Sequence, residues 1–139
     1  MNDRSLRVAA ALVAVAGIGV AGYLTWAHYA DVQIACLRGG GCETVQDSSY
    51  SEIAGVPVAL IGLLGYSAIL ALIAWDAPTA RLAVAALAVT GLLFSVYLLI
   101  LQAFVIDAFC VWCLANDIVA APALAVITAL RLRPAAPTS

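Results

Sequence analysis

Four long apolar stretches dominate the pattern of hydrophobic and polar positions along the chain. Residues 8–30, 53–75 and 82–106 contain no Asp, Glu, Lys or Arg, and residues 108–130 are interrupted only by Asp117. A helix needs about 20 residues to cross the roughly 30 Å hydrocarbon core of a bilayer. Because backbone groups find no water in lipid, segments this long and this apolar are expected to be helical. The pattern therefore predicts four transmembrane helices, over about residues 8–30, 55–75, 82–106 and 108–130.

The composition indicates the same class of protein. Of the 139 residues, 65% are apolar and only 10% are charged, and the mean hydropathy is +1.09. We expect an all-α integral membrane protein with a single domain, residues 1–139, folded as a four-transmembrane-helix bundle. The connection over residues 31–52 is expected to form a partly structured loop outside the cytoplasm. Its partners are expected to include membrane lipid and to exclude nucleic acid.

The first apolar run, which follows Arg4 and Arg7, can also be read as a secretory signal. It is longer than the roughly 7–15 apolar residues of such a signal, however, and it lacks a clear small-x-small cleavage site. We therefore expect it to remain as the first transmembrane helix.

The arginines predict the orientation of the helices. The chain has no lysine, and five of its six arginines flank the predicted helices on one side, namely Arg4, Arg7, Arg81, Arg131 and Arg133. The positive-inside rule places this side, with both termini, in the cytoplasm of a multi-pass protein of the cell membrane. The loop of residues 31–52 and the junction near Asp107 then face the extracytoplasmic side. All four cysteines lie on that side, where disulfides persist.

The second cysteine pair, Cys110 and Cys113, forms a Cys-x-x-Cys motif at the predicted start of the fourth helix. Spacing of i and i+3 places both sulfur atoms on one helix face. We expect Asp107 to cap this helix, which would place Cys110 in its first turn, where unpaired N–H groups favour a thiolate. The motif is therefore a candidate for thiol–disulfide exchange.

The first pair, Cys36 and Cys42, encloses three successive glycines. Such a loop cannot hold a helix, and its freedom suits a dithiol that moves between a soluble partner and a second cysteine pair. A static disulfide closing these seven residues would stabilise the fold by only about 2.4 kcal/mol in the chain-entropy estimate. A scaffold with two structural disulfides remains an alternative. A zinc site needs four ligands with comparable spacing in each half, so we expect no metal.

Several motifs together resemble the bacterial branch of the vitamin K epoxide reductase family. They are the Cys36-x5-Cys42 loop, the serine at position 48, residues 50–57 (YSEIAGVP) leading into the second helix, residues 95–98 (SVYL), and residues 109–113 (FCVWC). The resemblance runs from the loop to the fourth helix and covers most of the chain.

This resemblance implies a helix bundle around a quinone of the menaquinone, ubiquinone or vitamin K type. In that family pattern Cys110 exchanges with a loop cysteine, Cys113 lies next to the quinone ring, and Ser48 helps to hold the loop near the site, with Ser49 as the fallback. Electrons would pass from the Cys36/Cys42 pair to the Cys110/Cys113 pair and then to the quinone, in support of disulfide bond formation. Because the chain ends soon after Arg133, we expect the electron donor to be a separate thioredoxin-like or DsbA-like extracytoplasmic protein.

Two related activities remain open. Vitamin K quinone or epoxide reduction is one, but the vertebrate branch has a tyrosine at the place where this chain has Asp117, which weakens the case for epoxide. The DsbB type of quinone reductase also has four helices and two cysteine pairs, but it carries the Cys-x-x-Cys in its first outer loop, and this chain has the reverse order.

The quinone pocket is expected to lie between the outer halves of the helices. Its candidate residues are Phe109, Trp112, Phe104, Tyr97, Leu101, Val58, Leu60 and Ile61. The alternative for each of these side chains is that it only packs against other helices or against lipid. Asp117, an ionisable group inside a predicted span, is a candidate for hydrogen bonding to the quinone or for proton transfer. A structural hydrogen bond within the bundle is its equally weighted alternative.

Overall fold

A computed structural model describes residues 2–32, 44 and 48–133 of the chain. The loop cysteines Cys36 and Cys42 lie outside the described residues. The helical elements are α1 (Asp3–Ala30), η1 (Ser49–Ser51), α3 (Val58–Trp75), α4 (Pro78–Ile100), η2 (Leu101–Ile106), α5 (Val111–Leu114), η3 (Ala115–Ala120) and α6 (Ala121–Leu132). Two short antiparallel strands, β1 (Glu52–Ile53) and β2 (Val56–Pro57), form a hairpin before α3.

The described residues contain four helical spans long and apolar enough to cross a membrane, as the sequence predicted. The spans are Asp3–Ala30, Val58–Trp75, Pro78–Ile106 and Val111–Leu132. The third continues from α4 into η2, and the fourth runs through α5, η3 and α6. The predicted fold class, an all-α membrane bundle, is therefore confirmed.

Local backbone chemistry explains where the helices begin and end. The Asn2 side chain accepts a hydrogen bond from Ser5 N at 2.8 Å, so α1 begins about one turn before the apolar run. The second helix begins at position 58 instead of 55, because the residues before it form the hairpin, which turns at Ala54 and Gly55 with φ of 53° and 83°. Pro78 fits the first turn of α4, where its missing N–H costs nothing.

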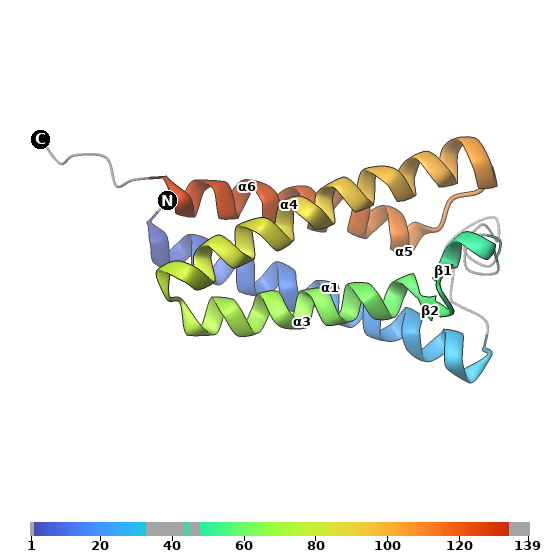
Figure 1. Ribbon diagram of the computed structural model, residues 1–139, viewed down its shortest axis with the longest axis horizontal. Coiled ribbons are helices and arrows are strands. Elements are labelled where there is room, and N and C mark those ends of the chain that lie inside the picture. The colour runs from blue at the N-terminus through green and yellow to red at the C-terminus, as the bar shows by residue number, and fades with distance from the viewer. Residues whose placement is uncertain (1, 33–43, 45–47, 134–139) are drawn as a thin grey trace, which may run out of the picture.

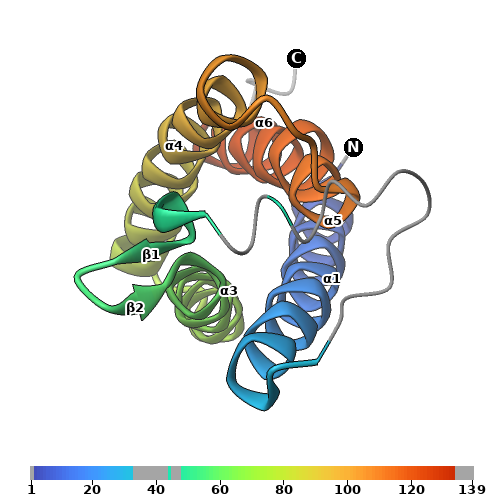
Figure 2. The same ribbon diagram turned by 90° about the vertical axis from the view of Figure 1, so that its right-hand side faces the viewer.

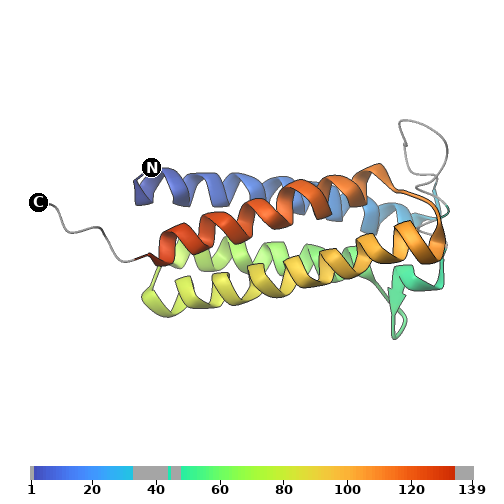
Figure 3. The same cartoon turned by 90° about the horizontal axis from the view of Figure 1, so that it is seen from above.

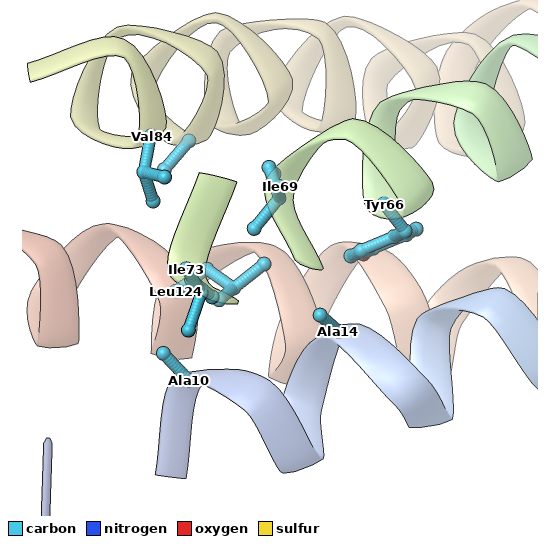
Figure 4. Packing of buried hydrophobic residues seen from close by; sticks show 8 residues of the cluster. Ala10, Ala14, Tyr66, Ile69, Ile73, Val84 and Leu124 are labelled. Carbon is cyan, nitrogen blue, oxygen red and sulfur yellow. The ribbon is translucent and has the colours of Figure 1, made fainter. Parts of the chain in front are cut away.

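The four long helices follow one another around the bundle in the order α1, α3, α4, α6, with α6 closing against α1 (Figure 2). Both described chain ends and the α3–α4 turn lie at one end, and the hairpin and α5 lie at the other (Figures 1 and 3). The core nearer the termini packs small residues of α1, such as Ala10 and Ala14, against Ile73 and Leu124 (Figure 4). These alanines let neighbouring helices approach closely.

Charged side chains join the helices at the end that carries the termini. Arg131, whose side chain is only 3% exposed, donates to Asp3 Oδ1 at 3.2 Å and to Asp76 Oδ1 at 2.6 Å. Arg81 binds both oxygens of Asp76 at 3.1 and 3.2 Å and also reaches Asp3. Arg7 donates to the carbonyl groups that end α3. Arg7, Arg81 and Arg131 therefore lie together at one end of the bundle, where they connect α1, α4 and α6 to the α3–α4 turn.

Candidate functional site

A cavity of about 440 Å³ lies between the helices. Its apolar wall comes mainly from α1, α3 and α4, with residues such as Val20, Leu24, Val58 and Phe94. Ser48, Tyr50, Ser51 and Ile53, from the segment before α3, line it from the hairpin end. Trp112 and Cys113 of α5 complete its wall on the fourth span. The cavity therefore meets both the Cys-x-x-Cys motif and the segment that follows the loop of the first cysteine pair.

The two cysteines of the motif occupy different environments. Cys110 is the residue before α5 and is fully buried, in contact with Ile106 and Ala108. Cys113 is the third residue of α5, is partly buried and lines the cavity. Only the second cysteine of the motif thus belongs to the cavity wall.

The expected N-cap role of Asp107 is wrong. Asp107 instead ends η2 in the left-handed conformation, with φ of 57°, and the chain then runs to the start of α5 at Val111. Cys110 is consequently the N-cap residue and not a first-turn residue, and its carbonyl group accepts from Leu114 N at 2.8 Å. Cys113 takes the first-turn position, where unpaired N–H groups favour nearby negative charge.

A connected set of polar side chains lies along one side of the cavity. The Tyr66 hydroxyl donates to Asn116 Oδ1. The Asn116 amide nitrogen donates to Asp117 Oδ1 at 3.0 Å and reaches Ser95 Oγ at 3.5 Å. Gln102 Nε2 lies 3.5 Å from Asp117 Oδ2, and Gln102 Oε1 accepts from Cys110 N at 2.9 Å. Both oxygens of Asp117 therefore accept hydrogen bonds, and its side chain is buried, with the residue 2% exposed. This carboxyl group within the fourth span is hydrogen-bonded inside the bundle.

The π-helical segments bring these polar groups inward. Gln102 belongs to η2, and Asn116 and Asp117 belong to η3. A π-helical turn holds one residue more than an α-helical turn and often occurs at functional sites. The extra residue shifts the face on which the following side chains lie, which an ideal helical period does not predict.

The structure brings some of the predicted pocket residues to the cavity and leaves others outside. The cavity is lined by Val58, Ile61, Leu101, Trp112, Asp117 and Ser48 among them. Tyr97, Phe104, Phe109 and Leu60 are not part of its wall. Tyr97 is 49% exposed, Phe104 82% and Phe109 50%. On α4 the stripe that faces the cavity runs through Leu87, Gly91, Phe94 and Leu98, so Tyr97 points to one side of it.

Sequence reasoning did not predict several polar residues of the cavity, among them Tyr66, Ser95 and Gln102. Gln102 carried a usable signal, because it is the only amide or charged side chain in the apolar run of residues 82–106. Ser95 belongs to the motif of residues 95–98, but its position in the cavity is not evident from the sequence. Trp112, between the two cysteines, packs against Tyr23 of α1 with ring centroids 5.4 Å apart.

Comparison with protein families agrees with this architecture. The model of the vitamin K epoxide reductase family matches residues 8–128, which include all four helical spans in large part and all four cysteines. Membership of this family supports an oxidoreductase function linked to quinones or vitamin K. The chain belongs to the vitamin K epoxide reductase family of multi-pass membrane proteins.

Proposed function

We propose that the protein is a quinone-dependent thiol–disulfide oxidoreductase that reoxidises a thioredoxin-like partner outside the cytoplasm. Electrons pass from the partner to Cys36/Cys42, then to Cys110/Cys113, and finally to a membrane quinone. In this proposal the arginine-rich end of the bundle faces the cytoplasm, following the positive-inside rule. The result is the formation of disulfide bonds in exported proteins.

The observation that carries this proposal is the position of Cys113 in the wall of a large, mostly apolar cavity. A quinone ring is flat and apolar and has two oxygen atoms that accept hydrogen bonds. The cavity volume of about 440 Å³ lies within the roughly 300–1,000 Å³ of small-molecule sites, and its lining is mostly apolar with a small number of polar side chains. The residues present therefore fit a quinone: Val58, Ile61 and Trp112 would offer apolar contacts, and Asn116 and Asp117 would offer polar groups to a quinone oxygen.

The exchange steps follow from ordinary thiol chemistry. A thiolate of the reduced partner attacks the Cys36–Cys42 disulfide, and the partner's second thiol resolves the mixed disulfide, which leaves both loop cysteines reduced. A loop thiolate then attacks Cys110, and Cys113 leaves as a thiolate. The second loop thiol closes the loop disulfide again and releases Cys110, so the motif is now a dithiol.

Reoxidation of the Cys110/Cys113 dithiol releases two electrons and two protons. A bound quinone supplies the acceptor for both. The protein contributes the placement of Cys113 in the wall of a mostly apolar cavity. Asp117, which lines the cavity and accepts hydrogen bonds from two amide groups, is placed to hold or pass one of the protons.

A purified-protein assay tests the proposal. The wild-type protein in detergent is expected to reduce a soluble quinone with a reduced thioredoxin-like protein as donor, and Cys113→Ala is expected to lower the rate at least about 100-fold, because the dithiol can no longer form a disulfide. Cys36→Ala is expected to abolish turnover with the protein donor but to retain turnover with dithiothreitol, which is small enough to reach the motif. Equal rates in wild type and Cys113→Ala would rule out this electron route.

The same assay tests for reduction of vitamin K epoxide. Vitamin K epoxide is offered in place of quinone, with dithiothreitol as reductant. We expect quinone reduction without epoxide reduction, and turnover of the epoxide at a comparable rate would move the assignment to the vitamin K reductase activity.

A further inference from the structure

One residue holds the segment that carries Cys110. Between η2 and α5 the chain crosses over residues 107–110, and three N–H groups of this segment donate to Gln102. The backbone carbonyl of Gln102 accepts from Asp107 N and from Ala108 N, the latter at 3.1 Å. Its side-chain Oε1 accepts from Cys110 N at 2.9 Å. The position of Cys110 thus depends on Gln102 through both main chain and side chain.

The orientation of the Gln102 amide follows from these partners. Cys110 N can only donate, so the amide oxygen must face it and the NH2 group must face the other way. That group points at Asp117 Oδ2, 3.5 Å away. The opposite oxygen of Asp117 accepts from Asn116 at 3.0 Å, so the carboxyl group presents acceptors to two amides. Gln102 is 2% exposed, so water cannot replace either partner.

We propose that Gln102 is a positioning residue that links Asp117 of the cavity to the backbone of Cys110. Its role rests on the proposed function, in which Cys110 is the sulfur attacked by the loop thiol. A buried side chain with an acceptor at one end and a donor at the other fixes the place of Cys110 relative to Cys113 and to the cavity. Gln102 touches neither sulfur and acts through the hydrogen bonds that orient the segment.

Two substitutions distinguish the contributions of the amide oxygen and the amide nitrogen of Gln102. Gln102→Met keeps the length of the side chain but removes both hydrogen bonds, and the N–H of Cys110 is left buried without its acceptor. Gln102→Glu keeps an acceptor for that N–H but sets a second carboxylate against Asp117. The double variant Gln102→Glu/Asp117→Asn reverses the polarity of the pair, because the introduced carboxylate accepts both from Cys110 N and from the amide introduced at position 117.

The readout is the alkylation rate of Cys110 by iodoacetamide in the full-length protein, reduced beforehand and held in detergent. Mass spectrometry gives the rate for Cys110 relative to Cys113 in the same molecule. We expect both single variants to raise this ratio about tenfold, because a lost buried hydrogen bond makes local opening easier. The double variant is expected to return it to within about twofold of wild type, as complementary hydrogen bonding is restored.

Thr128→Val provides a matched control. Thr128 is also buried and bonds Leu124 O at 2.8 Å, but it lies on α6 away from the cysteines, so its loss is expected to leave the ratio unchanged. An unchanged ratio in Gln102→Met, or a double variant whose ratio stays as high as that of Gln102→Glu, would overturn the proposal. If Gln102→Met does not fold, the comparison of Gln102→Glu with the double variant decides.

Alkylation requires neither quinone nor a protein donor. A wild-type protein without quinone reductase activity would therefore refute the proposed function and leave this result standing. Active wild-type protein with no change in the Gln102 variants would refute only the positioning role.

Discussion

Replacement of Gly17 by alanine tests the packing that shapes the cavity. Gly17 of α1 faces the ring of Tyr66 on α3, and a Cβ atom at this position would lie 2.6 Å from Cε1 and Cζ of that ring. Ordinary contacts to a Cβ begin at about 3.4 Å, so the two helices must separate by about 0.8 Å or the ring must turn. Tyr66 has little freedom to turn, because it is 8% exposed and its hydroxyl group is bonded to Asn116.

The size of the effect follows from opposing contributions. Overpacking of this kind costs about 1–3 kcal/mol. Rotation of the ring would also break the Tyr66–Asn116 hydrogen bond, worth about 1 kcal/mol. Alanine improves the helix by up to about 1 kcal/mol relative to glycine. We therefore expect Gly17→Ala to lower the free energy of unfolding by about 1–3 kcal/mol, and to reduce quinone turnover because Tyr66 and Asn116 line the cavity.

Gly19→Ala is the matched control, since it lies on the same helix and a Cβ there meets nothing within 4 Å. It measures the helix gain alone and is expected to leave stability unchanged or slightly raised. Unfolding is followed by tryptophan fluorescence during titration with sodium dodecyl sulfate, and quinone reduction is measured on the same preparations.

Removal of the ring gives a second check. In a Tyr66→Leu background Gly17→Ala is expected to cost far less, because the clash has no partner. If Gly17→Ala is as stable and as active as Gly19→Ala, the close approach of α1 to Tyr66 is not a constraint on the fold, and the reasoning fails.

The remaining predictions concern charged groups at the two ends of the bundle. Arg131→Met is expected to cost about 2 kcal/mol of unfolding free energy, since Arg81 still pairs with Asp76 and the carboxylate is not left alone. Burial favours the neutral form of Asp76, but hydrogen bonds from Arg131 and Arg81 outweigh it and hold the pKa of this carboxyl below its ordinary value of 3.8. The stabilisation is therefore present above about pH 4 and is lost as the pH falls through the lowered pKa, and an acid titration of Asp76→Asn should lack this step. At the other end, His28 Nε2 lies 2.9 Å from Glu52 Oε1. Glu52→Gln is expected to speed amide hydrogen exchange in the hairpin while changing global stability by less than about 1 kcal/mol, and unchanged exchange would contradict a role for this pair in holding the hairpin.

Much of the architecture can be predicted from the sequence, because it depends on residues that are close together along the chain. Four apolar runs of sufficient length, three of them without a charged residue and the fourth with only Asp117, predict four spans, since lipid leaves a helix as the only way to satisfy the backbone. The helix ends were less predictable, because Asn2 extends α1 and the hairpin delays α3. The grouping of five arginines at one end of the bundle also follows from the alternating direction of consecutive spans.

Among the residues that the sequence predicted for the site, Cys113, Trp112, Val58 and Asp117 line the cavity. The sequence indicated them by motif, by resemblance or by the rarity of a charge within a span. It misjudged the cap of the fourth span, because the left-handed turn at Asp107 and the extended segment after it depend on the carbonyl and side chain of Gln102.

The sequence by itself thus determined the class of protein and the number of spans, and it singled out the Cys-x-x-Cys motif. Only the tertiary structure decided which helix faces line the cavity and how the polar groups Tyr66, Asn116, Asp117 and Gln102 connect. Gln102, Asn116 and Asp117 lie on two π-helical segments, and a glycine on α1 leaves room for the ring of Tyr66 on α3. Such contacts join residues up to 50 positions apart, as Tyr66 and Asn116 are, so no local pattern records them.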